Sequence, residues 1–247
     1  MSSPLHQFEI HTILPLNVGG YDVSLTNSSL FMFLAVISAT IFFVLGMQKK
    51  SLVPGRLQAA AEMLHSSVAN IVGDTAGEHS KPYFPLIFSI FIFILFCNIL
   101  GMIPYSFTVT SHILVTFFLA LIVFLAVTIT GFAKHGLHFF SLFVPAGTPI
   151  VMVPLMFVLE VFSFCVRPFS LAIRLFANMM AGHIMLKVFA GMAVMLLTAG
   201  GATMVLLPLP VLLNVALTGF EFFVAGLQAY IFAILAAVYL HDALELH

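Results

Sequence analysis

The residues from Thr148 to about Ala190 form an apolar stretch with no convincing polar turn. An unbroken helix of this length would extend roughly 60 Å, about twice the thickness of the bilayer hydrocarbon core. Such a helix must kink, tilt strongly or run partly along the membrane plane. Pro154 and Pro168 are the possible kink sites.

The rest of the sequence also indicates a membrane protein. Its residues are 62% hydrophobic and only 7% charged, whereas soluble domains are about a quarter charged. Three more apolar runs are long enough to span a bilayer, namely Leu30–Met47, Pro85–Ile103 and Ile113–Phe132. Between the first two, Pro54–Ala76 places apolar residues at helical spacing among polar ones. That spacing predicts an amphipathic helix at the interface or against other helices.

The C-terminal third predicts a second long helix. Thr198–Gly201 is the best turn, Leu207–Pro210 suits a helix start, and the following apolar segment runs to about Leu240. We therefore expect an all-α, polytopic fold in one membrane domain, 1–247, with a hairpin of long helices at about 148–240.

Positive residues predict the orientation. If the spans alternate, five basic residues share one side, which should be cytoplasmic, with the N-terminus opposite and the C-terminus inside: Lys49, Lys50, Arg56, Lys81 and Lys134. The net charge of −1, without a basic cluster, gives no basis for a nucleic-acid partner. Two cysteines in apolar stretches, Cys97 and Cys165, suggest neither a disulfide framework nor a metal site, and we expect no cofactor.

Arg174 lies in the middle of the apolar run Phe162–Phe189. A guanidinium near the bilayer centre costs about 2.5–3.5 kcal/mol on insertion scales, and it cannot lose its proton to avoid that cost. The default interpretation is an ion or proton pathway. A structural ion pair with Glu160 or Glu221 is the alternative.

Polar residues form a stripe on each long helix. On the first helix they recur at steps of seven, with others three or four residues away: Glu160, Arg167, Ser170, Arg174 and Asn178. On the second helix they recur at steps of seven: Asn214, Glu221 and Gln228. Two such stripes can hold a hydrated path between the helices or face a third partner. Asn214 and Ser170 can also serve simply as inter-helix hydrogen-bonding groups.

His183 follows Arg174 by nine positions, about 180° around an ideal helix, and Lys187 follows one turn later. One helix face could then meet a partner while the other lines an access route. A histidine and a buried glutamate suit a proton relay. His183 could instead be a packing residue, and Arg167 and Lys187 could extend to the membrane interface without a further role.

The sequence closely resembles the subunit a family of the F-type ATP synthase. The motif is Ser170-x-x-x-Arg174-Leu-Phe-Ala-Asn178-x-x-Ala-Gly182-His183, joined by Glu221, Gln228, Tyr239-Leu240 and the segment Cys97–Pro104. The resemblance implies one vertical N-terminal helix, an interfacial amphipathic helix, further spans and a long tilted hairpin against the c-ring.

The resemblance also implies roles for individual residues. Arg174 would face the ring and interact with each passing c-subunit carboxylate, with Gln228 near it. His183 and Glu221 match a pair at the proton-access side, although acid and histidine are exchanged relative to some members, so which binds the proton first stays open. Glu160 matches an acidic position of the inner half-channel.

The implied protein is a proton-channel stator subunit of the Fo sector, in the bacterial inner membrane or, alternatively, the mitochondrial inner membrane. Its implied partners are the c-ring, b-type peripheral stalk subunits and, through the stalks, F1. The sequence has no nucleotide-binding motif, so ATP chemistry would belong to partner subunits. The rivals are a secondary ion transporter, which would need inverted repeats, and a haem oxidoreductase, which would need paired deep histidines.

Overall fold

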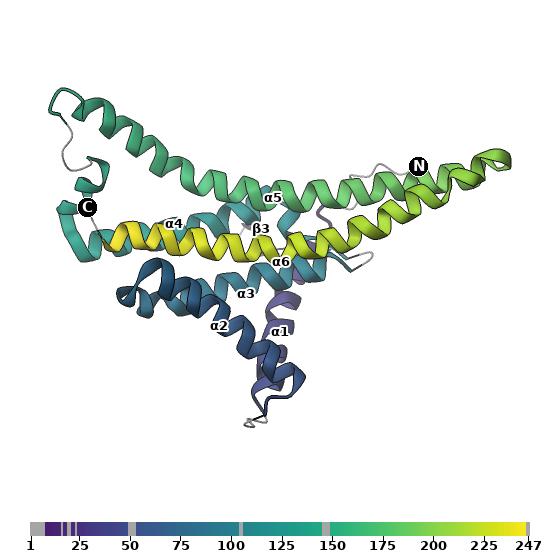
Figure 1. Cartoon of the computed structure of the whole chain (residues 1–247), viewed down its shortest axis with the longest axis horizontal. Helices are drawn as coiled ribbons and strands as arrows, with labels where there is room; N and C mark the ends of the chain where they lie inside the picture. The colour runs from purple at the N-terminus through teal and green to yellow at the C-terminus, as the bar shows by residue number, and fades with distance from the viewer. Residues whose placement is uncertain are drawn as a thin grey trace.

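The computed structural model describes residues 8–15, 17–18, 21–22, 24–48, 53–103, 106–144 and 149–245. Six long helices dominate it (Figure 1): α1 (Asn27–Met47), α2 (Arg56–Ala76), α3 (Phe84–Gly101), α4 (Ile113–His135), α5 (Val153–Ala199) and α6 (Pro208–Leu244). Four short 3-10 helices connect them: η2 (Glu78–Tyr83), η3 (Val109–Ser111), η4 (Gly136–Phe143) and η5 (Gly201–Leu206).

The N-terminal span begins earlier than its apolar run because a capping box starts it. Thr26 Oγ1 accepts from the Ser29 amide at 3.3 Å, and Ser29 Oγ accepts from the Thr26 amide at 2.9 Å. This reciprocal pair satisfies amide groups that have no partner inside the helix. α1 therefore begins at Asn27 rather than Leu30.

Two small antiparallel strand pairs precede α1, and the sequence did not predict them. β1 (Thr12–Leu14) pairs with β4 (Leu25–Thr26), and β2 (Asn17–Val18) pairs with β3 (Tyr21–Asp22). Strands this short carry too few residues to show an alternating pattern. The side chain of Asn27 ties this segment to α1, because Nδ2 donates to the Glu9 carbonyl oxygen at 3.0 Å.

The predicted amphipathic helix is α2. Its apolar residues Ala61, Val68, Ile71 and Val72 are buried against neighbouring helices, whereas residues on its other face are exposed. α2 packs against α1, α3 and α6. Its apolar stripe is thus covered by protein, one of the two placements that the pattern allowed.

α5 and α6 form the predicted hairpin. Gly200 and Gly201 have φ of 66° and 63°, the left-handed region that favours glycine, and they end α5. Over its 47 residues α5 extends roughly 70 Å. Pro154 lies in its first turn and Pro168 lies inside it without ending it. Figure 1 shows the two helices side by side near the turn and separating toward the start of α5.

Small buried residues let α6 pack closely in the centre of the molecule. Ala225, Ala229, Ala233 and Ala237 recur every four residues, so they form one ridge of α6, and α3 and α4 pack against this helix. The described residues contain five helical segments long and apolar enough to cross a membrane. The structure therefore confirms an all-α polytopic membrane protein.

The ends of α4 and α6 lie together, as the orientation argument requires. Lys134 Nζ donates to the Leu244 carbonyl oxygen at 3.1 Å, so the basic end of α4 and the C-terminal end of α6 are on one side. Lys49 and Lys50, on which the same argument relied, lie outside the described residues. Thr148, where the predicted long apolar stretch begins, and Pro104, the last residue of the segment Cys97–Pro104, also lie outside the described residues.

Candidate functional site

His183 of α5 and Glu221 of α6 face each other across the hairpin. Nδ1 of His183 lies 3.7 Å from Oε1 of Glu221, and the side chains are only 12% and 5% exposed. Neither carboxyl oxygen of Glu221 has a hydrogen-bond partner among the described residues. The structure thus brings together two titratable groups that are 38 positions apart in the sequence, as the proton-relay hypothesis requires.

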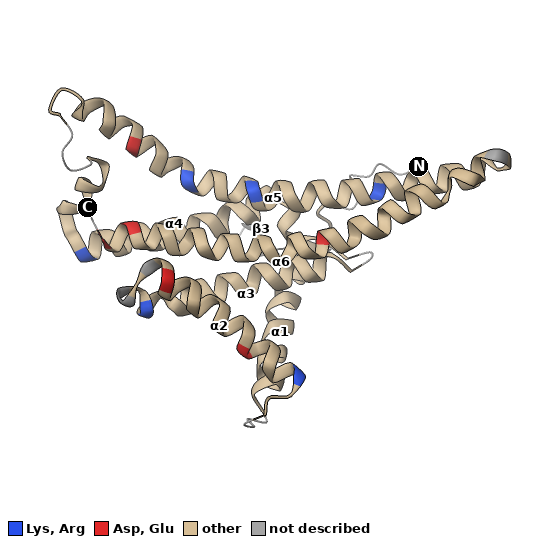
Figure 2. Ribbon diagram, in the orientation of Figure 1, with Lys and Arg blue, Asp and Glu red and all other residues tan. Residues whose placement is uncertain are grey.

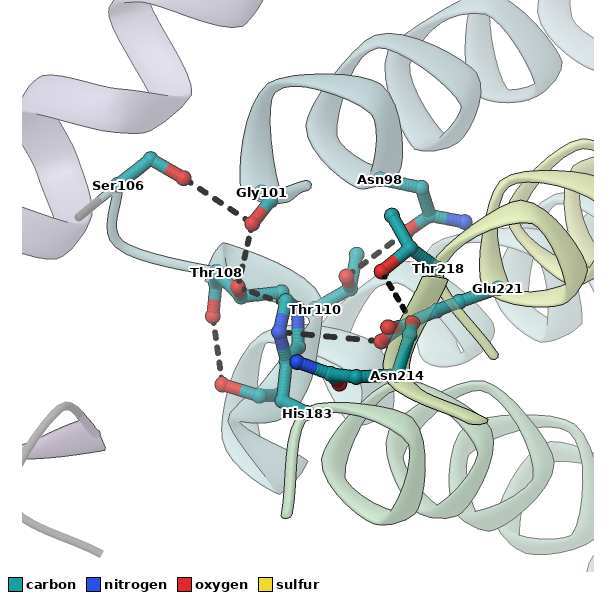
Figure 3. A network of polar contacts seen from close by, with 10 residues as sticks. Asn98, Gly101, Ser106, Thr108, Thr110, His183, Asn214, Thr218 and Glu221 are labelled. Carbon is teal, nitrogen blue, oxygen red and sulfur yellow. Dashed lines mark hydrogen bonds and ion pairs between the residues drawn. The ribbon is translucent and has the colours of Figure 1, made fainter. Parts of the chain in front are cut away.

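A network of hydroxyl and amide groups surrounds this pair on the side of α3 (Figure 3). Thr108 Oγ1 lies 2.9 Å from His183 Nε2. Thr110 Oγ1 donates to Asn98 Oδ1 at 2.7 Å. Asn98 Nδ2 donates to the Ala225 carbonyl oxygen at 3.1 Å. Asn98 thereby fixes the backbone of α6 one turn beyond Glu221.

Sequence reasoning missed this network. Asn98 lies inside the segment Cys97–Pro104, whose sequence alone assigns it no role, and nothing in the local pattern of Thr108 or Thr110 distinguishes either from a helix-start hydroxyl. Their partners lie on other elements, so only the fold reveals the contacts.

An open cleft of about 720 Å³ reaches the His183 side of this network. Its walls come from the N-terminal segment, α1, the end of α3, α5 and α6. Polar residues that line it are Glu9, His11, Asn27, Ser106, His183, Lys187, Asn214 and Thr218. Lys187 and Asn214 therefore border a cleft that is large enough to hold water. His183 lies where this space meets the buried network.

Asn178 and Gln228 join the two long helices nearer the middle. Asn178 Nδ2 donates to Gln228 Oε1 at 2.7 Å, and Gln228 is 1% exposed. Asn178 follows Arg174 by one helical turn, so this bond fixes α6 against α5 beside the arginine. The two polar stripes thus do meet.

Arg174 itself lies on an exposed face of α5, with Ser170 one turn before it also exposed. No described carboxylate forms an ion pair with its guanidinium. Glu160 pairs with Arg167, and Glu221 faces His183. The alternative in which Arg174 pairs with Glu160 or Glu221 is therefore wrong for this structure.

Arg167 forms a second charged cluster toward the start of α5. Its Nη1 lies 2.9 Å from Asp242 Oδ2, and its Nη2 lies 4.0 Å from Glu160 Oε1. The guanidinium also lies over the Tyr239 ring, 4.9 Å from the centroid. Arg167 is thus held between α5 and α6 and does not simply extend to the interface. Sequence reasoning missed Asp242, whose place at a helix end resembles an ordinary surface residue.

Charged residues are spread along α5 (Figure 2). Arg167 is seven residues before Arg174, roughly 10 Å along the helix, and His183 is nine residues after it, roughly 14 Å. A cation that pairs with no described carboxylate therefore lies between two polar clusters. Among the described residues, no group of three or more His, Cys, Asp or Glu could hold a metal ion.

Comparison with known proteins identifies the family. The family described as "ATP synthase A chain" matches residues 29–241. The proteins named "ATP synthase subunit a" from Pelagibacter ubique and Rhodospirillum rubrum are 52% and 51% identical over 247 residues, covering 100% of this chain and 99% and 100% of theirs. The one from Parvibaculum lavamentivorans is 52% identical over 242 residues, 98% of this chain and 93% of the relative.

These relatives are bacterial, and the described residues form several membrane-spanning segments. Both observations support a multi-pass protein of the bacterial inner membrane rather than the mitochondrial alternative. The matches cover nearly the whole sequence, so this chain belongs to the ATP synthase subunit a family.

Proposed function

We propose that this chain is the proton-channel stator subunit of the Fo sector, with two half-channels that exchange protons with carboxylates of a c-ring. One observation carries the proposal. Arg174 has no ion pair with a described carboxylate and presents its charge on an exposed face of α5, between a cleft-side pair of titratable groups and a second charged cluster.

The first half-channel consists of the cleft and the pair His183–Glu221. Protons from the cleft reach this pair, and either group can take up a proton and release it to the other, since the two face each other at 3.7 Å. From the pair, a proton passes to a ring carboxylate and neutralises it.

The second half-channel lies at the opposite end of the path, at Glu160, Arg167 and Asp242. Two carboxylates near one guanidinium give a proton leaving the ring two acceptor groups, while the guanidinium balances their charge. Tyr239 covers the guanidinium and restricts its movement.

Arg174 separates the two half-channels. It keeps its proton, so it cannot pass one on, and its charge favours the ionised form of a ring carboxylate that moves past. A proton crossing 100 mV of membrane potential releases about 2.3 kcal/mol, so several protons can supply the work of rotation. Asn178 and Gln228 hold α5 and α6 together beside this charge.

The exposed apolar side chains around Arg174, such as Phe169 and Ile173, suit contact with apolar helices of a ring. Further partners are b-type peripheral stalk subunits, and F1 through the stalks. The ATP chemistry belongs to F1, and this subunit contributes proton transfer and not catalysis of its own.

The substitution Glu221→Gln tests the proposal. We expect passive proton flux through Fo in membrane vesicles to fall at least tenfold while the complex still assembles, because an amide of the same shape cannot carry the proton. Glu62→Gln is the matched control, since Glu62 is exposed on α2 and does not line the cleft. Equal flux in the two variants would contradict a relay at Glu221.

A further inference from the structure

The hydroxyl of Thr108 is held in one place by contacts on several sides. It lies 2.9 Å from His183 Nε2 and 3.3 Å from the carbonyl oxygen of Gly101. Ser111 fixes the local backbone, because its hydroxyl donates to the Thr108 carbonyl oxygen at 2.6 Å. Thr108 is 4% exposed. The side chain of Thr108, the residue immediately before η3, is therefore held in place by contacts within the protein itself.

Gly101 makes this close approach possible. A Cβ at position 101 would lie 2.8 Å from Thr108 Cγ2, closer than side-chain atoms pack. The end of α3 thus leaves room for Thr108. The carbonyl oxygen of Gly101 becomes the second partner of the threonine hydroxyl (Figure 3).

The two partners of this hydroxyl differ in chemistry. The Gly101 carbonyl oxygen can only accept a hydrogen bond, whereas Nε2 of a histidine accepts when it is unprotonated and donates when it is protonated. A hydroxyl has one proton and two lone pairs, so it can serve both forms. With neutral His183 protonated on Nδ1, Thr108 donates to Nε2. With charged His183, Nε2 donates to Thr108 and the threonine proton turns to Gly101.

We propose that Thr108 is a positioning residue for His183: its hydroxyl reverses its hydrogen bond as the imidazole gains and loses a proton, and so keeps Nδ1 directed at Glu221 in both states. This inference rests on the proposed proton relay at His183 and Glu221. No covalent bond changes at Thr108, which keeps one proton throughout.

Other charged and titratable groups face the same imidazole. Glu221 approaches from α6, Lys187 lies one turn along α5, and Glu9 and His11 line the cleft from the N-terminal segment. The ring of Phe8 approaches edge-on, 6.4 Å between centroids, and offers no hydrogen bond. Among the described residues, only Thr108 makes a hydrogen bond at Nε2.

The substitution Thr108→Val removes the hydroxyl and keeps the shape. We expect passive proton flux in vesicles carrying the assembled complex to fall roughly tenfold, the loss typical of one hydrogen bond to a charged group. The pH dependence of the flux should change together with it, since the charged form of His183 loses a partner. Thr108→Ser keeps the hydroxyl and should restore both the flux and its pH profile.

Thr116→Val is the matched control. Thr116 is 0% exposed and, among the described residues, its hydroxyl bonds only to carbonyl oxygens at the start of its own helix α4. It therefore reports the effect of a buried Thr→Val change away from His183, and its flux and pH profile should match the wild type.

A second background shows whether Thr108 acts through His183. In a His183→Ala chain, adding Thr108→Val should cause no further loss of flux. Wild-type flux in Thr108→Val, or an equal additional loss in the His183→Ala background, would overturn the inference. Wild-type flux in His183→Ala alone would instead contradict the proposed relay itself, so the two failures are distinguishable.

Discussion

Gly182 leaves the space that the carboxyl group of Glu221 occupies. A Cβ at position 182 would lie 2.5 Å from Oε1 and 2.8 Å from Cδ of Glu221. Because these carboxyl oxygens have no hydrogen-bond partner among the described residues, packing against α5 is what positions them beside His183. A glycine next to the histidine is thus part of the geometry of the pair.

We therefore expect Gly182→Ala to move the Glu221 carboxyl away from His183 and to lower passive proton flux at least several-fold. Gly191→Ala is the control on the same helix, because a Cβ there would meet nothing within 4 Å. Alanine favours a helix over glycine by about 1 kcal/mol, so the control should assemble at least as well as the wild type. Equal flux in the two alanine variants would show that the glycine has no such role.

The facing geometry also predicts that His183 and Glu221 can exchange places. The double variant His183→Glu with Glu221→His should retain more flux than either single change, since it keeps one acid and one imidazole across the same gap. Flux and assembly are measured for all three variants. A double variant no more active than the worse single variant would argue that the two positions act independently.

The contact between Arg167 and Asp242 predicts that substituting the arginine has a larger effect than substituting the aspartate. Arg167→Ala removes the cation beside two carboxylates, whereas Asp242→Asn leaves Glu160 near the arginine. The first change should lower the melting temperature of the assembled complex and its ATP synthesis more than the second. The loss of stability in the double variant should also be smaller than the sum of the two single losses, by a coupling free energy of about 1 kcal/mol.

The control for that series is Arg56→Ala, which removes an exposed arginine from α2 without a described ion pair. Additive losses, or a loss at Arg56 equal to that at Arg167, would mean that the cluster contributes no specific interaction.

The amide contact between Asn178 and Gln228 predicts a stability effect. Asn178→Ala leaves the buried Oε1 of Gln228 without its donor, which costs about 1–3 kcal/mol. Adding Gln228→Leu should recover part of that stability, because the unpaired amide is then gone. Thermal unfolding of the complex measures the stability of the single and the double variant. The control is Asn70→Ala, which removes an exposed amide from α2. No recovery in the double variant would refute this account of the contact.

The sequence predicted the membrane helices because hydrophobic length and periodicity are local properties. The run around Leu30–Met47 became α1, the pattern over Pro54–Ala76 became α2, and Thr198–Gly201 ended α5. Helix ends were less predictable. α6 extends to Leu244 rather than Leu240, and the start of α1 depends on a side-chain cap at Thr26.

The site was predictable where residues of one helix share a face, and not where the fold brings separate elements together. The stripe of Arg167, Arg174 and Asn178 could be read from spacing. The contacts of Thr108 with His183 and of Asp242 with Arg167 could not, since each joins positions 75 residues apart in the sequence. The roles in proton transfer stay predictions for every residue of the site: Arg174, His183, Glu221, Gln228, Glu160, Asn178, Asn214, Ser170 and Arg167.

The most direct test of the account is ATP-driven proton pumping into membrane vesicles by the wild type and Arg174→Ala, with assembly of the complex measured in parallel and Arg56→Ala as the charge-matched control. The account predicts that Arg174→Ala assembles but no longer pumps, because the fixed charge between the half-channels is gone, while Arg56→Ala pumps as the wild type does. Normal pumping by an assembled Arg174→Ala complex would contradict the central role given to this arginine.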